Sequence, residues 1–122
     1  MTLTRRFIAL GLPALLFARP AIAHHGWRWT DDGRFELRGL ITEARLGNPH
    51  GVLTIDAEGE IWKAEVGQPW RNERAGLTDA MLAPGTDIKI IGKRAADPKE
   101  RLVKAEAIEL SGALFELYPE RL

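Results

Sequence analysis

The alternation in residues 34–43, RFELRGLITE, most constrains what this chain can fold into. Phe35, Leu37, Gly39 and Ile41 fall on one side of this segment, and Arg34, Glu36, Arg38 and Thr42 fall on the other. A period of two puts the two sets on opposite faces of a strand, which predicts a half-buried β-strand. Gly39 inside this pattern favours a bulge or a sharp bend, as a coiled barrel strand requires.

Four more segments have strand patterns, and one short helix is predicted among them. The strands are Val52–Asp56, a third strand with Trp62, Ala64 and Val66 facing inward, residues 86–94 and residues 101–110; Glu58-Gly59 is the predicted hairpin turn and residues 69–76 the helix. This β-β-β-α-β-β order predicts a mainly β fold, a small five-stranded OB-like barrel with one short helix. An open five-stranded sandwich is the alternative. The tail, residues 115–122, is expected to pack on a sheet edge.

Residues 1–23 have the order of a secretory signal. Arg5 and Arg6 precede an apolar run from residue 7 to 17, and Ala21-Ile22-Ala23 is typical of a cleavage site. Thr4 to Ile8 partly resembles a twin-arginine signal. An uncleaved anchor is the alternative, but the apolar run is short for a membrane span. We expect a mature chain of residues 24–122 in a bacterial periplasm or secreted, with an N-terminal His/Trp arm at 24–33 and the OB-like domain at 34–122.

Composition narrows the classes of function. Arg5, Arg6 and Arg19 fall in the signal, so 14 of the 17 basic residues remain against 17 acidic ones. That balance favours neither nucleic acid nor an anionic membrane as a partner, and no membrane span is expected after cleavage. The chain has no cysteine, which excludes disulfides and thiolate metal sites. It has one serine, Ser111, and no nucleophile motif, so covalent catalysis is not expected.

The three histidines are the candidate metal ligands. Cleavage after Ala23 would make His24 the first residue, whose free amine and imidazole can chelate one ion. His50, in the Asn48-Pro49-His50 turn, is the third nitrogen that would complete a histidine brace. His25 offers another arrangement, through the amine, the intervening amide and its own ring. Nitrogen ligands without thiols favour Cu(II). A solvated chain end without any metal is the competing interpretation.

The aromatic and acidic residues are assigned mainly structural roles. Trp27 and Trp29 are expected to fold the arm onto the barrel, with Trp27 and Asn48 as support for the metal site. Trp62 is expected in the core, and Trp70 over the barrel end. Four glutamates fall at outward strand positions and are expected on the solvated face: Glu36, Glu43, Glu65 and Glu106.

Several of these motifs together resemble one family of small exported bacterial proteins, known as a domain of unknown function. The motifs are AHHGW at 23–27, the strand with Gly39, NPHG at 48–51, Trp62, RAGL at 74–77 and LAPG at 82–85. The resemblance covers nearly all of the mature chain, and the His-His start with Asn-Pro-His is its most specific part. It implies export and one compact β domain, and no particular reaction.

These observations favour an exported periplasmic copper-binding protein for metal handling, delivery or buffering, with the ion, and another periplasmic protein, as partners. The alternative is a metal-free OB-like module that binds a small molecule or a partner protein. An oxidative copper enzyme is the least favoured, because about 99 residues leave little surface for a substrate groove beside the ion.

Processing is the first testable prediction. The exported protein is expected to begin at His24, because small residues occupy the positions one and three before that cut. Intact-mass measurement and N-terminal sequencing of protein from the periplasm test this. A chain that begins at Met1, or after His25, would remove the chelating amine.

Overall fold

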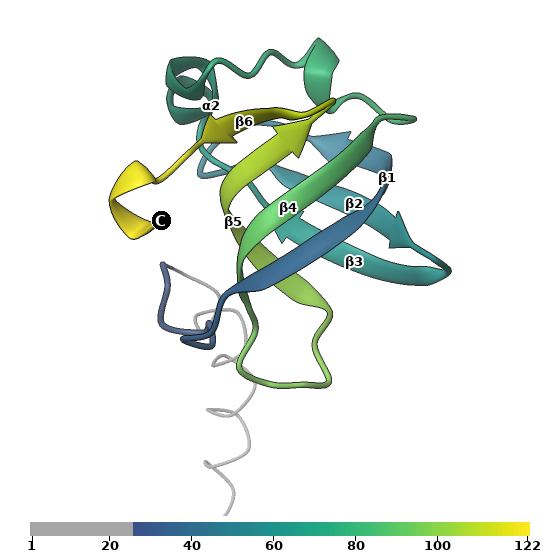
Figure 1. The fold of residues 1–122 in the computed structure, drawn as a ribbon, viewed down its shortest axis with the longest axis vertical. Coiled ribbons are helices and arrows are strands. Elements are labelled where there is room, and N and C mark those ends of the chain that lie inside the picture. The colour runs from purple at the N-terminus through teal and green to yellow at the C-terminus, as the bar shows by residue number, and fades with distance from the viewer. Residues whose placement is uncertain (1–25) are drawn as a thin grey trace, which may run out of the picture.

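Five strands close into a barrel, with the third strand paired to both the second and the fifth (Figure 1). The structure is a computed structural model that describes residues 26–122; the predicted signal peptide, His24 and His25 lie outside the described residues. The strands are β1 (Phe35–Arg45), β2 (Val52–Ala57), β3 (Glu60–Glu65), β4 (Asp87–Arg94), β5 (Leu102–Leu110) and β6 (Ala113–Glu116). The helices are α2 (Pro69–Ala75) and two 3₁₀ helices, Ala80–Leu82 and Pro119–Arg121.

The sheet order is β3-β2-β1-β4-β5-β6, and a parallel pairing of β3 with β5 closes the ring. The other neighbouring strands are antiparallel. The predicted mainly β, five-stranded OB-like barrel with one short helix is therefore confirmed. β6 is an addition to the five predicted strands: it pairs with β5, so the tail does pack on a sheet edge.

The predicted alternation of β1 holds as far as Ile41 and then breaks. Leu37 and Ile41 are buried, and Ile41 is fully enclosed. The register against β2 shifts between Ile41 and Glu43, two residues after the glycine. Of the two predicted roles of Gly39, a bulge or a sharp bend, the bulge lies two residues further on, and at Gly39 itself a Cβ would lie 2.6 Å from the Asp56 carbonyl oxygen. The glycine allows β1 and β2 to approach closely as the barrel coils.

The β2–β3 hairpin follows from its two turn residues. Glu58 and Gly59 have φ values of 54° and 92°, the left-handed pair that a two-residue hairpin turn needs. The Asp56 carboxylate accepts a hydrogen bond of 2.8 Å from the Gly59 N–H. This turn puts Trp62 inside the barrel, where it is buried as predicted.

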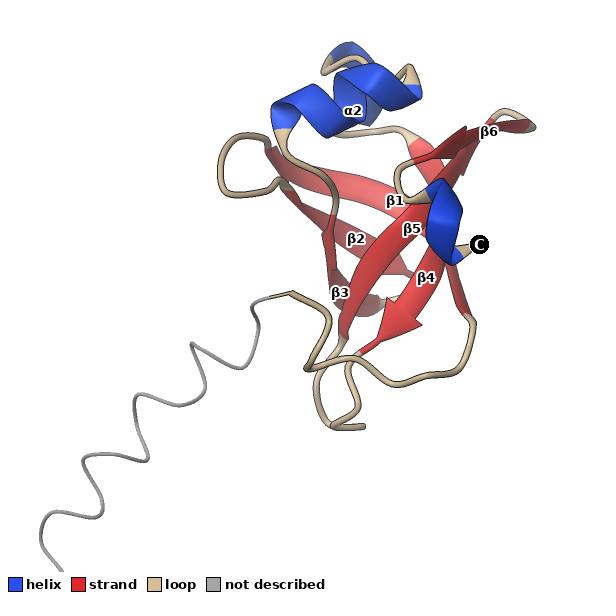
Figure 2. Cartoon of the chain, turned by 90° about the vertical axis from the view of Figure 1, so that its left-hand side faces the viewer, coloured by secondary structure: helices blue, strands red, loops and turns tan. Residues whose placement is uncertain are grey.

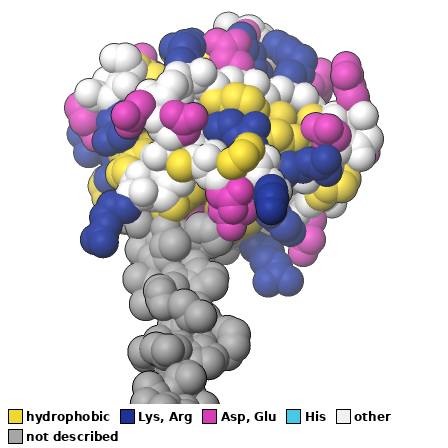
Figure 3. Space-filling model, turned by 90° about the horizontal axis from the view of Figure 1, so that it is seen from below, with side chains coloured by type: hydrophobic (Ala, Val, Ile, Leu, Met, Phe, Trp, Pro, Cys, Tyr) yellow, Lys and Arg dark blue, Asp and Glu magenta, His cyan; other side chains and the backbone are white. Residues whose placement is uncertain are grey.

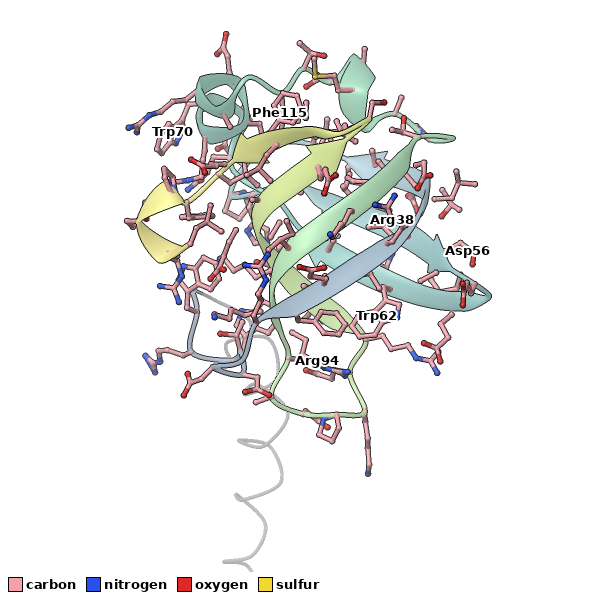
Figure 4. All side chains as sticks on the ribbon, viewed as in Figure 1. Arg38, Asp56, Trp62, Trp70, Arg94 and Phe115 are labelled. Atoms are coloured by element: carbon pink, nitrogen blue, oxygen red, sulfur yellow. The ribbon has the colours of Figure 1, made fainter. Side chains whose placement is uncertain are left out.

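Helix α2 lies across one end of the barrel (Figure 2). It starts at Pro69, where the missing N–H removes no hydrogen bond of the helix. Gly76, in the left-handed conformation, caps the helix after Ala75. Leu77 and Leu82, which follow the helix, are the buried side chains that join the core there. Trp70 was expected to cover this end, but its side chain is 50% exposed and points away from the barrel (Figure 4).

An arginine and two aromatic rings meet near the opposite end of the barrel. The Arg94 guanidinium lies 4.9 Å from the centre of the Trp62 ring and 5.4 Å from that of Phe35 (Figure 4). The same guanidinium donates to the carbonyls of Pro98 and Glu100. The loop after β4 is thereby tied to the core aromatics. Among residues 26–122, no helix has the length and apolarity to span a membrane.

The close approach at Gly39 gives a prediction for stability. Gly39→Ala should lower the free energy of unfolding by about 1–3 kcal/mol, because the new methyl group meets backbone that cannot move without opening the barrel. Denaturant unfolding of the mature chain measures the loss. Gly33→Ala is the matched control: a Cβ there meets no atom within 4 Å, and its effect should stay within about 0.5 kcal/mol. Equal stability of the two variants would contradict the close approach.

Candidate functional site

The turn before β2 holds His50 against the end of β3. Gly51 exchanges backbone hydrogen bonds with this segment, donating to Gly67 (3.0 Å) and accepting from Val66 (2.9 Å). A Cβ on Gly51 would lie 2.8 Å from the Val66 side chain, so glycine permits this contact. His50 Nε2 consequently lies 3.2 Å from Glu65 Oε2, and the imidazole side chain remains 25% exposed.

Glu65 is buried, which corrects the prediction that it lies on the solvated face. It is the last residue of β3 and pairs with Lys104 across the parallel β3–β5 closure. Glu65 Oε1 lies 3.5 Å from Lys104 Nζ, and the two residues are 5% and 8% exposed. Removing one partner of such a pair leaves an uncompensated buried charge, at a cost of about 3–5 kcal/mol.

Glu106 is buried too, although it was also predicted to lie on the solvated face. It is 3% exposed, and its carboxylate pairs with Arg121 Nε at 3.2 Å. The backbone N–H groups of Leu117 and Tyr118 donate to the Glu106 carbonyl, which lays the C-terminal segment along β5. Glu65, Lys104 and Glu106 do point outward from the barrel, but the two ends of the described chain cover this face. Glu36 and Glu43 are exposed, as expected.

The N-terminal arm is the second segment that covers this outer face of the barrel. Lys104 Nζ donates a hydrogen bond of 3.2 Å to the carbonyl of Gly26, the first described residue, and lies 4.9 Å from the centre of the Trp27 ring. Trp29 is buried, and its carbonyl accepts a hydrogen bond from Ala96. Trp27 and Trp29 thus fold this part of the arm onto the barrel, as predicted.

Aromatic rings and cations alternate along this cover. The Arg121 guanidinium lies 3.8 Å from the centre of the Trp27 ring, and Tyr118 meets Trp27 edge to face at 5.1 Å. The Arg71 guanidinium lies 4.1 Å from Tyr118 and 4.5 Å from Trp70. Each such contact is worth about 0.5–1 kcal/mol where exposed and more where desolvated. Together they join the two ends of the described chain to α2.

A pocket lies between α2 and the C-terminal segment. Its charged lining residues are Arg71, Arg74, Glu116 and Glu120. The two signs balance, so the pocket has no evident preference for an anion or a cation. On the described surface visible in Figure 3, acidic and basic side chains are likewise interspersed, with apolar ones between them.

Of the predicted site residues, the structure describes His50, Trp27 and Asn48. It connects His50 to the start of the arm through Glu65 and Lys104. Asn48 is exposed and has no hydrogen bond within the described chain. No group of three or more His, Cys, Asp or Glu residues within 26–122 is arranged to hold a metal ion. His24 and His25 lie outside the described residues.

Sequence reasoning missed Glu65 and Lys104, although one signal for them existed. The OB-like order pairs β3 with β5, and this pairing places the two strands that carry these charges side by side. The strand pattern did not indicate that these two side chains are buried, because the ends of the described chain, which lie over the outer face, are what covers them.

Fold and site together define a small OB-like barrel whose outer β3–β5 face is covered by both ends of the described chain. The chain belongs to the family described as "Family of unknown function (DUF6152)", whose model matches residues 14–103. This confirms the resemblance to a family of unknown function. No curated protein matches the chain.

Solved structures share the fold at low identity. The Stn1–Ten1 complex of S. pombe is 18% identical with a TM-score of 0.51, over 63% of this chain and 57% of that chain. A ZRD-deleted mutant of TiaS in complex with agmatine is 20% identical with a TM-score of 0.50, over 69% of this chain and 26% of that chain. This protein therefore covers less than two thirds of either neighbour, and the likeness concerns the barrel alone.

Tyr118 gives a prediction that depends on this cover. Burial raises the pKa of Tyr118 above its ordinary value of 10.0, and the positive charge of Arg71 opposes the rise only in part. Since the folded state holds the proton more tightly, its stability is intact below about pH 10 and falls as the pH rises through the raised pKa. Tyr118 is the only tyrosine, so phenolate absorbance measures its titration directly.

The folded protein should titrate above pH 10 and the urea-unfolded chain near 10. A folded midpoint at or below that of the unfolded chain would contradict the packing of the C-terminal segment around Tyr118.

Proposed function

We propose that the mature protein is an exported, periplasmic Cu(II)-binding protein that handles, delivers or buffers the ion. His24 would chelate the ion through its amine and imidazole, with His50 or His25 completing the nitrogen ligands. The observation that carries the proposal is the path of contacts from His50 to the arm. Glu65 lies 3.2 Å from His50 and 3.5 Å from Lys104, and Lys104 donates to the Gly26 carbonyl at 3.2 Å.

This path supports a site at the terminus because of chain length. A cut after Ala23 leaves two residues before Gly26, which span at most about 7 Å of backbone. The first described residue of the arm, Gly26, lies beside the Glu65–Lys104 pair, so a terminal histidine two residues earlier would have a short distance to cover to His50. Among the described residues, His50 supplies the imidazole and the buried Glu65 supplies negative charge near a bound cation.

The chemistry of the donors favours copper. A terminal amine and imidazoles offer nitrogen atoms that suit the tetragonal geometry of Cu(II), and Cu(II) stands above Zn(II) in the divalent affinity series. The ligands must lose protons to coordinate, so affinity should fall in acid.

The test compares the mature protein, residues 24–122, with the same chain carrying an added N-terminal Met-Gly. The addition converts the His24 amine to an amide and leaves all described contacts in place. We expect the mature protein to bind one Cu(II), more tightly than Zn(II), and the extended protein to bind Cu(II) at least about 10-fold more weakly. Competition titration with a chelator of known affinity measures both. Equal affinities would show that the terminus is not a ligand.

Single substitutions separate the two arrangements of ligands. His50→Ala should weaken Cu(II) binding about 10-fold or more if the His50 ring is a ligand. His25→Ala should do so if the ion is held by the terminal chelate of amine, amide and second ring. Wild-type affinity in both variants would leave only the amine and imidazole of His24 and would contradict a further nitrogen ligand from His25 or His50.

A further inference from the structure

We propose that Glu65 is a positioning residue for the metal site: it holds Nε2 of His50 and so presents Nδ1 to the ion, while Lys104 couples this carboxylate to the docked arm. The proposal rests on the proposed function and adds two residues that sequence reasoning had assigned to no site. It also names the ligand atom of His50.

The first step is the proton on His50. Glu65 Oε2 lies 3.2 Å from His50 Nε2, and the lone pairs of two acceptors would repel each other at this distance. A neutral imidazole in this position is therefore expected to carry its proton on Nε2. Nδ1 then keeps its lone pair. No hydrogen bond to His50 Nδ1 occurs within the described chain, and the side chain is 25% exposed. Metal-binding histidines commonly direct their other ring nitrogen at a carboxylate in this way.

The second step is the rigidity of the carboxylate. Glu65 is 5% exposed and sits on β3 where the barrel closes, opposite Lys104. Its Oε1 has no hydrogen bond in the described structure and lies 3.5 Å from the ammonium group. Oε2 is therefore turned toward the imidazole by an ion pair that solvent scarcely reaches.

The third step is the coupling to the arm. The same Lys104 ammonium donates to the Gly26 carbonyl and lies over the Trp27 ring. One cation thus holds the carboxylate that orients His50 and the residue that follows the His24-His25 pair. A single buried group thus contacts both Glu65, beside the His50 ring, and Gly26, the first described residue.

The orientation of His50 can be tested without any metal. Long-range ¹H–¹⁵N spectra of the metal-free mature protein distinguish the two imidazole tautomers, and His50→Ala assigns the signals. We expect His50 to be the Nε2–H tautomer in its neutral form. The Nδ1–H tautomer would overturn the proposal even if copper binds. Failure of the wild-type protein to bind Cu(II) would instead overturn the proposed function, and this result is read from a separate titration.

The metal-binding role is tested with Cu(II) as the probe. Glu65→Gln should weaken binding 10–100-fold. Glu106→Gln is the matched control: it also neutralises a buried carboxylate on this face, but one that pairs with Arg121, and it should bind as the wild type does. Equal losses in the two variants would mean that only the stability of the face matters, and would overturn the proposal.

Two further variants distinguish a loss of binding from misfolding and from effects that do not act through His50. Glu65→Gln combined with Lys104→Met removes both charges and leaves neither one unpaired, so it should fold and still bind Cu(II) weakly. In a His50→Ala background, Glu65→Gln should cause no further loss, because its effect acts through that ring. Wild-type affinity in the first variant, or additive losses in the second, would contradict the positioning role.

Discussion

The parallel pairing of β3 with β5 is the interaction on which the rest of this structure depends. It turns a curved sheet into a closed barrel and puts Glu65 directly opposite Lys104. Two charges in this position need each other, because either one alone would be buried without a counter-charge. The strand closure and the ion pair are therefore one feature, and His50 and the start of the arm both attach to it.

Burial of this outer face distinguishes the protein from a bare OB-like barrel. Small domains without disulfides have little apolar core to spare, and this chain uses both ends to enlarge its packed area. The arm contributes Trp27 and Trp29, and the C-terminal segment contributes Leu117 and Tyr118. Cations placed between the rings let charged residues join this layer while keeping their polar atoms paired. The layer also gives the arm a defined starting point, which a free chain end would lack.

The proposal of copper binding rests on more than the His-His motif, because it depends on the packing of the arm over the outer face of the barrel. A terminal histidine can chelate a metal on any chain, and such binding would be weak and unspecific for the protein. Here the arm is docked within a few contacts of the only other distant histidine, next to a buried carboxylate. Preorganisation of this kind reduces the entropy lost when ligands gather around an ion. The barrel contributes by linking His50 to the described part of the arm through Glu65 and Lys104. The family assignment is neutral on activity.

The sequence by itself determined the local features of this protein. Alternation located the barrel strands, turn residues located the hairpin, and Pro69 with Gly76 bounded the helix, since each depends on residues near one another in the chain. Trp62 was placed in the core for the same reason. The burial of Glu65 and Glu106 was mispredicted, and the register shift of β1 lies between Ile41 and Glu43, two residues after Gly39. A period of two tells which side of a strand a residue faces. The tertiary structure alone decided what lies over that side: the two ends of the described chain, far apart in sequence, cover these charges, and Glu65 and Lys104 connect His50 to the described arm.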